Sequence, residues 1–302
     1  MSLLVVGSMA FDSIKTPHGS AENILGGSAV YFSIAASRLV PVRLVGVVGE
    51  DYPREFLDVL GSHRVDTAGV EFALGKTFRW SGEYFQDMNR RQTLSVELNV
   101  FEKFQPKIPP QYRDSEFVFL ANGAPVTQLS VLSQIRQPRF VMADTMDLWI
   151  NTQRRDLEAL LRKIDGLLIN DDEALLLTGE RNLVRAGKAV LAMGPRIVVL
   201  KKGEHGGLLI TSDLVVPLPA YPLAEVSDPT GAGDSFAGGL MGYLASQRSV
   251  DAPQFKAALA MGTVIASFTV EDFGVDRLLG ASPDEIRERF NEYCALLRID
   301  GT

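Results

Sequence analysis

The run Asp228-Pro229-Thr230-Gly231-Ala232-Gly233-Asp234 lies between a turn-rich stretch and an apolar segment, residues 235–245, that is typical of a helix. Its small residues leave the backbone uncovered where that helix is expected to begin. Free N–H groups and the positive end of the helix dipole make such a place a binding site for an anion. The run also ends on a carboxylate, Asp234. A base beside an anion site favours phosphoryl transfer, because the base takes a proton while the site holds developing charge.

Strand and helix patterns alternate along the rest of the chain. Short apolar runs typical of buried parallel strands occupy residues 2–7, 42–48, 117–120, 139–143, 166–169 and 196–200. Helical patterns occupy residues 28–39, 54–62, 126–134, 152–163 and 183–193, and then residues 233–245, 253–268 and 283–297. This alternation predicts an α/β fold, with βαβ units and a parallel sheet covered by helices on both faces.

Two stretches, residues 11–24 and 70–98, interrupt the alternation. Neither carries a helical pattern, and the second alternates polar with apolar and aromatic residues, so both favour antiparallel strands. A small sheet that rises from the strand ends of an α/β body, where ligands bind, is a natural lid. We therefore expect one domain over residues 1–302, with a lid formed by these two insertions.

Composition excludes several classes of protein. The chain has 302 residues, a net charge of −7 and a pI near 5.1, which argues against a nucleic-acid partner because such binders usually present a basic face. No run of about 18 apolar residues indicates a membrane span. The first strand pattern begins next to Met1, so no signal peptide is expected. The single cysteine, Cys294, permits no intramolecular disulfide, and we expect a cytoplasmic protein.

The run at 228–234 and its continuation Ser235-Phe236-Ala237-Gly238-Gly239 resemble the signature of the ribokinase-like carbohydrate kinases, the PfkB family. A second signature of that family, a Gly-Gly pair before a helix, is matched by Leu25-Gly26-Gly27-Ser28-Ala29-Val30-Tyr31. Alone, the pair favours a tight turn into a helix, with Ser28 as N-cap, over a binding site. Together the two signatures imply the family's fold, a three-layer αβα sandwich with a Rossmann-like, mainly parallel sheet and a small β-sheet lid.

The resemblance implies roles for individual residues. Asp234 would be the catalytic base, and an anion hole would be formed by the N–H groups of Gly231, Ala232 and Gly233. The acceptor substrate would contact Asp12, Gly26, Gly27 and Asn122. The nucleotide would contact Lys201, Gly203 and Ser267. Magnesium and its waters would be ordered by Asn170 and Glu173.

Several of these residues also have a purely structural interpretation. Asp12 suits a turn as well as a sugar hydroxyl. Asn170 and Glu173 fit a capping box at the start of a helix, and both roles are compatible. Lys201 replaces a threonine common in the family, and residues 201–207 are typical of a glycine hairpin in which His205 is a turn residue.

The resemblance therefore implies an ATP- and magnesium-dependent kinase that phosphorylates a hydroxyl of a sugar or sugar-like small molecule. Met146, Trp149 and the lid aromatics Phe78 and Trp80 are compatible with the alternative of a nucleoside kinase of the same fold. Packing in the core or lid is the favoured explanation of these four side chains. A non-catalytic ligand-binding module is a third hypothesis, which the intact Asp234 disfavours. A monovalent cation near Asp228 and the loop after Ser267, and a homodimer joined through the lid, are further expectations.

Overall fold

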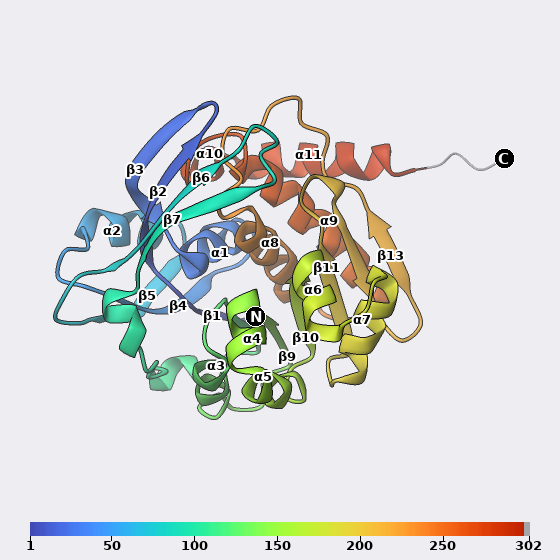
Figure 1. Ribbon diagram of the computed structural model, residues 1–302, viewed down its shortest axis with the longest axis horizontal. Coiled ribbons are helices and arrows are strands. Elements are labelled where there is room, and N and C mark those ends of the chain that lie inside the picture. The colour runs from blue at the N-terminus through green and yellow to red at the C-terminus, as the bar shows by residue number, and fades with distance from the viewer. Residues whose placement is uncertain (299–302) are drawn as a thin grey trace.

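The computed structural model describes residues 1–298, and the last four residues of the expected domain lie outside this range. Within it, a nine-stranded sheet has the order β13-β12-β11-β10-β9-β8-β1-β4-β5 (Figure 1). Its strands are β1 (Leu3–Val6), β4 (Val42–Val48), β5 (Val65–Phe72), β8 (Phe117–Leu120), β9 (Phe140–Asp144), β10 (Gly166–Asn170), β11 (Ile197–Lys201), β12 (Gly207–Ile210) and β13 (Val215–Leu218). Neighbours from β5 to β11 pair in parallel, and β12 and β13 add an antiparallel edge.

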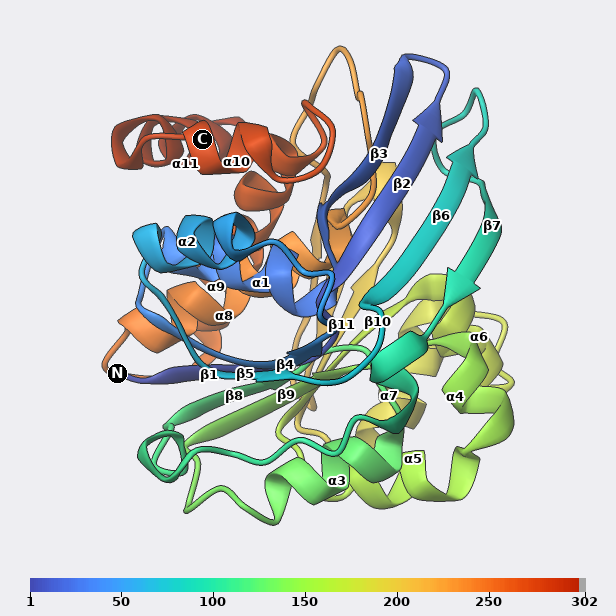
Figure 2. The ribbon, with the colours of Figure 1, turned by 90° about the vertical axis from the view of Figure 1, so that its left-hand side faces the viewer.

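Helices cover both faces of this sheet, as Figure 2 shows. One layer consists of α1 (Ser28–Ser37), α2 (Arg54–Ser62), α8 (Ala232–Ser246), α9 (Ala252–Thr269), α10 (Asp276–Gly280) and α11 (Pro283–Leu296). The other consists of α3 (Pro125–Leu132), α4 (Asp147–Thr152), α5 (Arg154–Leu161), α6 (Asp171–Thr178) and α7 (Leu183–Ala192). Short 3-10 helices are η1 (Asn99–Lys103), η2 (Pro110–Tyr112) and η3 (Gly203–His205). The predicted three-layer αβα sandwich is confirmed.

The apolar strands explain why two helix layers are needed. In β1, Leu3 and Val5 pack into the core beneath α1 and α8, whereas Leu4 and Val6 pack into the core on the α3 and α5 side. All four are at most 5% exposed. Burial of each such side chain stabilises the fold by about 1.5–3 kcal/mol, so a bare face on either side would be costly.

A second sheet, the lid, rises from the edge of the large sheet at which the parallel strands end (Figure 2). Its order is β3-β2-β6-β7, and its strands are β2 (Ala10–Thr16), β3 (Gly19–Gly26), β6 (Phe78–Tyr84) and β7 (Arg91–Glu97). Both insertions thus supply lid strands. The second begins later than expected, because residues 70–72 end β5, which pairs with β4 in the large sheet. The two hairpins join through β2 and β6, which are parallel rather than antiparallel.

Some elements lie outside the sequence patterns. Strands β5 and β13 and the short helices α4 and α10 are not predicted. Strand β13 and the two helices have too few residues to show a period, and the end of β5 lies within the stretch expected to form the second lid insertion. The glycine hairpin after β11 is present, because β11 and β12 pair antiparallel. In the part of the chain that the structure describes, no helix is both long and apolar enough to cross a membrane.

Candidate active site

The anion site lies at the start of α8, above the large sheet. Gly231 is its N-cap residue, with φ 72°, a left-handed backbone that L side chains rarely adopt. A Cβ at this position would lie 2.2 Å from the Tyr31 ring. Among residues 1–298, no acceptor is found for the N–H groups of Gly231 and Gly233, whereas the Ala232 N–H donates to the Pro229 carbonyl at 3.2 Å. Two of the predicted anion-hole donors are therefore available, and the third is engaged in a turn.

Asp234 lies in the first turn of α8, directly beside these donors. Burial raises the pKa of Asp234 to about 7, and the nearby Asp144 carboxylate raises it further, while Lys201 and Arg91 oppose the shift. A carboxyl group with this pKa can accept a proton near neutral pH more readily than an ordinary aspartate. Its environment therefore suits a general base.

Asp12 faces the same site from the lid. It lies on β2, is 5% exposed and accepts a hydrogen bond from the Gly27 N–H at 3.4 Å. Burial raises the pKa of Asp12 to about 7, which the Gly27 hydrogen bond opposes and the carboxylates of Asp234 and Asp228 reinforce. The structure thus brings the predicted acceptor residue and the predicted base into one electrostatic environment.

The Gly-Gly pair is shaped by this close packing. A Cβ on Gly26 would lie 2.1 Å from the Asp12 carboxylate, and Gly27 has φ 98°. The N-cap of α1 is Gly27, so the prediction of Ser28 as N-cap is wrong. Instead, Ser28 is the first helical residue, and its N–H donates to the Ser8 hydroxyl at 3.0 Å. The pair therefore lets the backbone pass directly beside Asp12.

The ends of β9, β10 and β11 form the opposite side of the site. Asn170 and Glu173 make the predicted capping box at the start of α6, with hydrogen bonds of 2.7 and 3.0 Å. Burial raises the pKa of Glu173 to about 7, although Lys201 lowers it. The Lys201 ammonium donates to Asp144 Oδ2 at 3.1 Å, and a Cβ on Gly233 would lie 3.3 Å from it. Lys201 therefore reaches the anion site.

Two lid residues that sequence reasoning missed also face the site. Tyr84, at the end of β6, accepts a hydrogen bond from the Thr230 hydroxyl at 3.3 Å. Arg91 lies opposite Tyr84 on β7, and its charge lowers the pKa of both Asp12 and Asp234. Its guanidinium lies 5.6 Å from the centre of the Trp80 ring. The lid is thus closed over the signature run in this structure.

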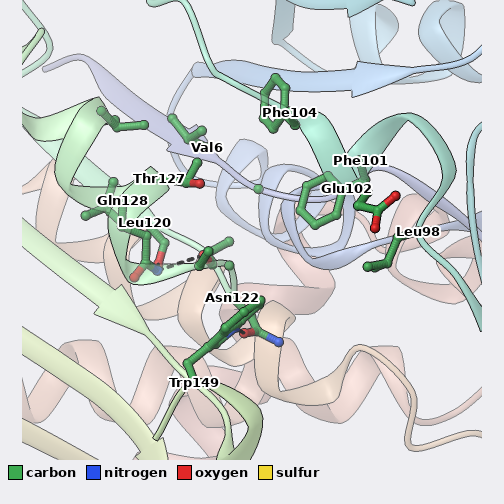
Figure 3. Close-up of a pocket in the computed structure, with 15 residues that line it drawn as sticks. Val6, Leu98, Phe101, Glu102, Phe104, Leu120, Asn122, Thr127, Gln128 and Trp149 are labelled. Atoms are coloured by element: carbon green, nitrogen blue, oxygen red, sulfur yellow. Dashed lines mark hydrogen bonds between the residues drawn. The ribbon is translucent and has the colours of Figure 1, made fainter. Parts of the chain in front are cut away.

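A cavity of about 110 Å³ opens beside the ends of β1 and β8 (Figure 3). Its walls include Leu98 and Phe101 at the base of the lid, Asn122 after β8, and Trp149 on α4. The Trp149 indole N–H donates to Asn122 Oδ1 at 3.0 Å, and Asn122 Nδ2 donates to the Met146 sulfur at 3.1 Å. The predicted acceptor residue Asn122 thus lies at a largely apolar cavity.

The lid aromatics do not line this cavity. Phe78 stacks on Phe101 with ring centroids 5.5 Å apart, and Trp80 packs against Arg91. Packing within the lid therefore accounts for Phe78 and Trp80.

The remaining predicted residues have structural contacts of their own. Gly203, with φ 53°, begins η3, and a Cβ there would lie 3.2 Å from the Asn89 side chain at the lid tip. Ser267 is 5% exposed, donates to the Val264 carbonyl and accepts from Arg289. The Ser267 hydroxyl is thus already engaged both as a hydrogen-bond donor and as an acceptor. A contact between Ser267 and adenine stays a prediction.

Comparison with known proteins is consistent with this geometry. The chain matches the model of the pfkB family carbohydrate kinases over residues 2–279. It is 31% identical over 251 residues to the cytidine kinase of Thermococcus kodakarensis, covering 80% of this chain and 88% of that one. It is 28% identical over 290 residues to the nucleoside kinase of Methanothermobacter thermautotrophicus, covering 90% of each.

Solved structures show the same fold. The nucleoside kinase of Methanocaldococcus jannaschii has a TM-score of 0.77 at 20% identity, covering 96% of this chain and 98% of that one. A ribokinase-type protein of E. coli, in complex with ATP and Mg²⁺, has a TM-score of 0.79 at 18% identity, covering 96% and 99%.

Proposed function

The chain belongs to the pfkB family of carbohydrate kinases, and we propose that the acceptor of this kinase is a nucleoside rather than a free sugar. The cavity at Asn122 is the observation that carries the proposal. It adjoins the end of β1, the strand that leads to Asp12, so a sugar bound at Asp12 could extend a base toward it. An engineered apolar cavity of about 150 Å³ binds benzene, so about 110 Å³ suits a single ring.

The chemistry of the walls supports a base rather than a second sugar. Leu98, Phe101 and Trp149 offer apolar and aromatic surface, which suits the faces of a heterocycle. The Asn122 amide keeps one N–H beyond its contact with the Met146 sulfur, which is a weak acceptor. The relative from Thermococcus kodakarensis is a cytidine kinase, whose base has one ring. A pyrimidine nucleoside is therefore the preferred acceptor.

The proposal assigns transfer to the signature run. Asp234 accepts the proton of the sugar hydroxyl, and the hydroxyl oxygen forms a bond to the γ-phosphorus of ATP. The bond between the γ-phosphorus and the β,γ-bridging oxygen breaks, which releases ADP. Backbone N–H groups of Gly231 and Gly233 stabilise the charge on the transferring phosphoryl group. Asp12, Gly26 and Gly27 hold the sugar.

The nucleotide side of the proposal involves Lys201, Gly203 and Ser267, with Lys201 contacting phosphate oxygens. Mg²⁺, when bound, neutralises phosphate charge. Asn170 and Glu173 supply the oxygen donors that this ion prefers, and Glu173 keeps one carboxylate oxygen free of its capping bond. Among the described residues, no group of three or more histidine, cysteine, aspartate or glutamate side chains is placed to hold a metal ion.

A monovalent cation near Asp228 is a further part of the proposal. Asp228 is fully buried, and its carboxylate accepts from the N–H groups of Thr230 and Gly274, which ties the signature run to the loop after Ser267. Turnover in K⁺ compared with choline buffer measures this dependence. We also expect this kinase to act in the cytoplasm, where ATP is supplied.

A panel of acceptors tests the choice of substrate. With ATP and Mg²⁺, we expect phosphorylation of cytidine or uridine at a kcat/KM at least about 10-fold above that for adenosine, inosine, ribose, fructose or 2-keto-3-deoxygluconate. One missing or added methylene in an apolar pocket already changes binding by roughly 1–3 kcal/mol, and a missing or larger ring changes it by at least as much. ADP release measures turnover, and mass spectrometry identifies the product. Equal turnover of ribose and cytidine would contradict the proposal.

We also propose a homodimer joined through the lid. Strand β7 is an edge strand, and its side chains Leu94 and Val96 are 53% and 51% exposed. Exposed edges of this kind readily pair with another chain. Light scattering should give twice the mass of the chain, and Leu94→Lys should halve it. A wild-type monomer would refute the dimer.

A further inference from the structure

Lys201 and Asp144 form a buried ion pair beside the anion site. We infer that Asp144 is a positioning residue for phosphoryl transfer, which holds the Lys201 ammonium at the anion site and keeps it from pairing with Asp234. The inference rests on the proposed roles of Asp234 and the anion site, and it concerns a residue to which neither the signatures nor the resemblance assigns a role.

The pair is fixed by the sheet. Asp144 ends β9 and Lys201 ends β11, on either side of β10, and their side chains are 7% and 21% exposed. Asp144 Oδ2 accepts from Lys201 Nζ at 3.1 Å, and Oδ1 accepts from the Thr145 N–H at 2.9 Å. Because both carboxylate oxygens are engaged, Asp144 is a rigid anchor.

The anchored ammonium lies against the first turn of α8. A Cβ on Gly233 would be only 3.3 Å from Lys201 Nζ, so this ammonium lies directly beside the Gly233 backbone. An ammonium has three N–H donors, and Asp144 uses one. The others can bond to oxygens of an anion held at the start of α8, where charge-assisted hydrogen bonds are strong.

The balance of charge explains why an anchor is needed. The carboxyl groups of Asp144, Glu173 and Asp234 all lie near Lys201. A buried cation pairs with an available carboxylate, and a direct pair with Asp234 would hold this base in its charged form and make it a weaker proton acceptor. Asp144 takes that position instead. Lys201 is thereby directed to the phosphoryl group and Asp234 to the acceptor hydroxyl.

Kinetics of Asp144→Asn, Lys201→Met and the double variant test the inference. Each single variant should lower kcat by about 10- to 100-fold, on the scale of losing one preorganised electrostatic group, while KM for the acceptor changes less than about threefold. The double variant should be no slower than Lys201→Met, since residues that act as one unit are not additive. Asp165→Asn is the matched control, because Asp165 pairs with Arg196 at 3.0 Å before the start of β10, at the opposite edge of the sheet.

The acid limb of the pH–rate profile gives a readout that a merely structural role would not move. Among the groups that face Asp234, Asp144 raises its pKa, whereas Lys201 and Arg91 lower it, and Asp12 lies nearby. The limb should therefore move to lower pH in Asp144→Asn and to higher pH in Lys201→Met. The acid limb should move in opposite directions in the two variants only if Asp144 and Lys201 both act on the pKa of Asp234.

Three results separate failure of the inference from failure of the proposed function. Wild-type kcat and an unmoved limb in Asp144→Asn, or additive losses in the double variant, would overturn the role of Asp144. Absence of phosphoryl transfer in the wild-type enzyme would instead overturn the proposed function. Should Asp144→Asn not fold, Asp144→Glu carries the test, because it keeps the carboxylate but displaces the group that holds Lys201 Nζ at 3.1 Å. Its kcat should fall while its acid limb stays near that of the wild type, and wild-type kcat in Asp144→Glu would overturn the role of Asp144.

Discussion

Replacement of Asp234 by asparagine is expected to lower kcat by roughly 10³-fold or more and to leave ATP binding intact, because the variant keeps the size of the side chain but loses the proton acceptor. Steady-state turnover with the acceptor that the panel identifies measures kcat, and calorimetric titration measures ATP binding. Asp213→Asn, at an exposed turn carboxylate, is the control and should retain full turnover. Unchanged turnover in Asp234→Asn would refute the assigned role.

The same prediction has a pH dependence. Because the pKa of Asp234 is raised to about 7, kcat/KM of the wild-type enzyme should rise as the pH increases through 7 and then level off. Asp12 and Glu173 also have pKa values near 7, so the limb belongs to the coupled carboxyl groups of the site. A profile that is flat from pH 5 to 9 would contradict a general base in this environment.

Stability should move in the opposite direction. The pKa of Asp234 is raised above its ordinary value of 3.8, so the folded protein binds the proton more tightly than the unfolded chain. The stability from this proton is fully present below pH 3.8 and is lost as the pH rises through about 7. Asp234→Asn, which never carries the charge, should therefore melt at a higher temperature than the wild type at pH 8, although it is inactive.

The sequence contains enough to predict which residues gather at the site, for a geometric reason. Parallel strands end at one edge of a sheet, so polar residues that end β10 and β11 or follow β1 and β8 must converge there. Asn122, Asn170 and Lys201 are found in this way. Asp234 and Gly231 are found from the backbone chemistry of a helix N-terminus. These predictions depend only on local pattern and on the direction of the strands.

Other contacts depend on which strands are neighbours, and sequence order does not determine this. Asp144 meets Lys201 because β10 alone separates β9 from β11 in the sheet. Tyr84 meets Thr230 only when the lid folds over the signature run, which lies 146 residues further along the chain. Arg91 has no motif around it, and its role follows from the pairing of β6 with β7. Charges that tune the base are therefore the part of the site that required the structure.

Gly231→Ala should also cause a large loss of turnover, with kcat lowered by about 10²–10³-fold. The loss would come from displacement of the backbone at the anion site, since glycine has no side chain to lose. The left-handed φ of 72° costs a non-glycine residue about 1–2 kcal/mol, and the new Cβ would lie 2.2 Å from the Tyr31 ring. Either the ring or the loop must shift, and a displacement of about 1 Å in a catalytic group can cost 10²-fold in rate. Loss of aligned anion-hole donors has an effect of about 10²–10³-fold.

Gly179→Ala separates strain from steric overlap. Gly179 ends α6 with the same φ of 72°, but a Cβ there would meet no atom within 4 Å. The Gly179→Ala variant should lose about 1–2 kcal/mol of unfolding free energy, because alanine is strained in the left-handed region, and it should keep full turnover. Gly231→Ala should lose more stability than this control, and its kcat should fall while ATP still binds. Equal losses of stability in the two variants, with full turnover in both, would show that the Tyr31 contact does not shape the anion hole.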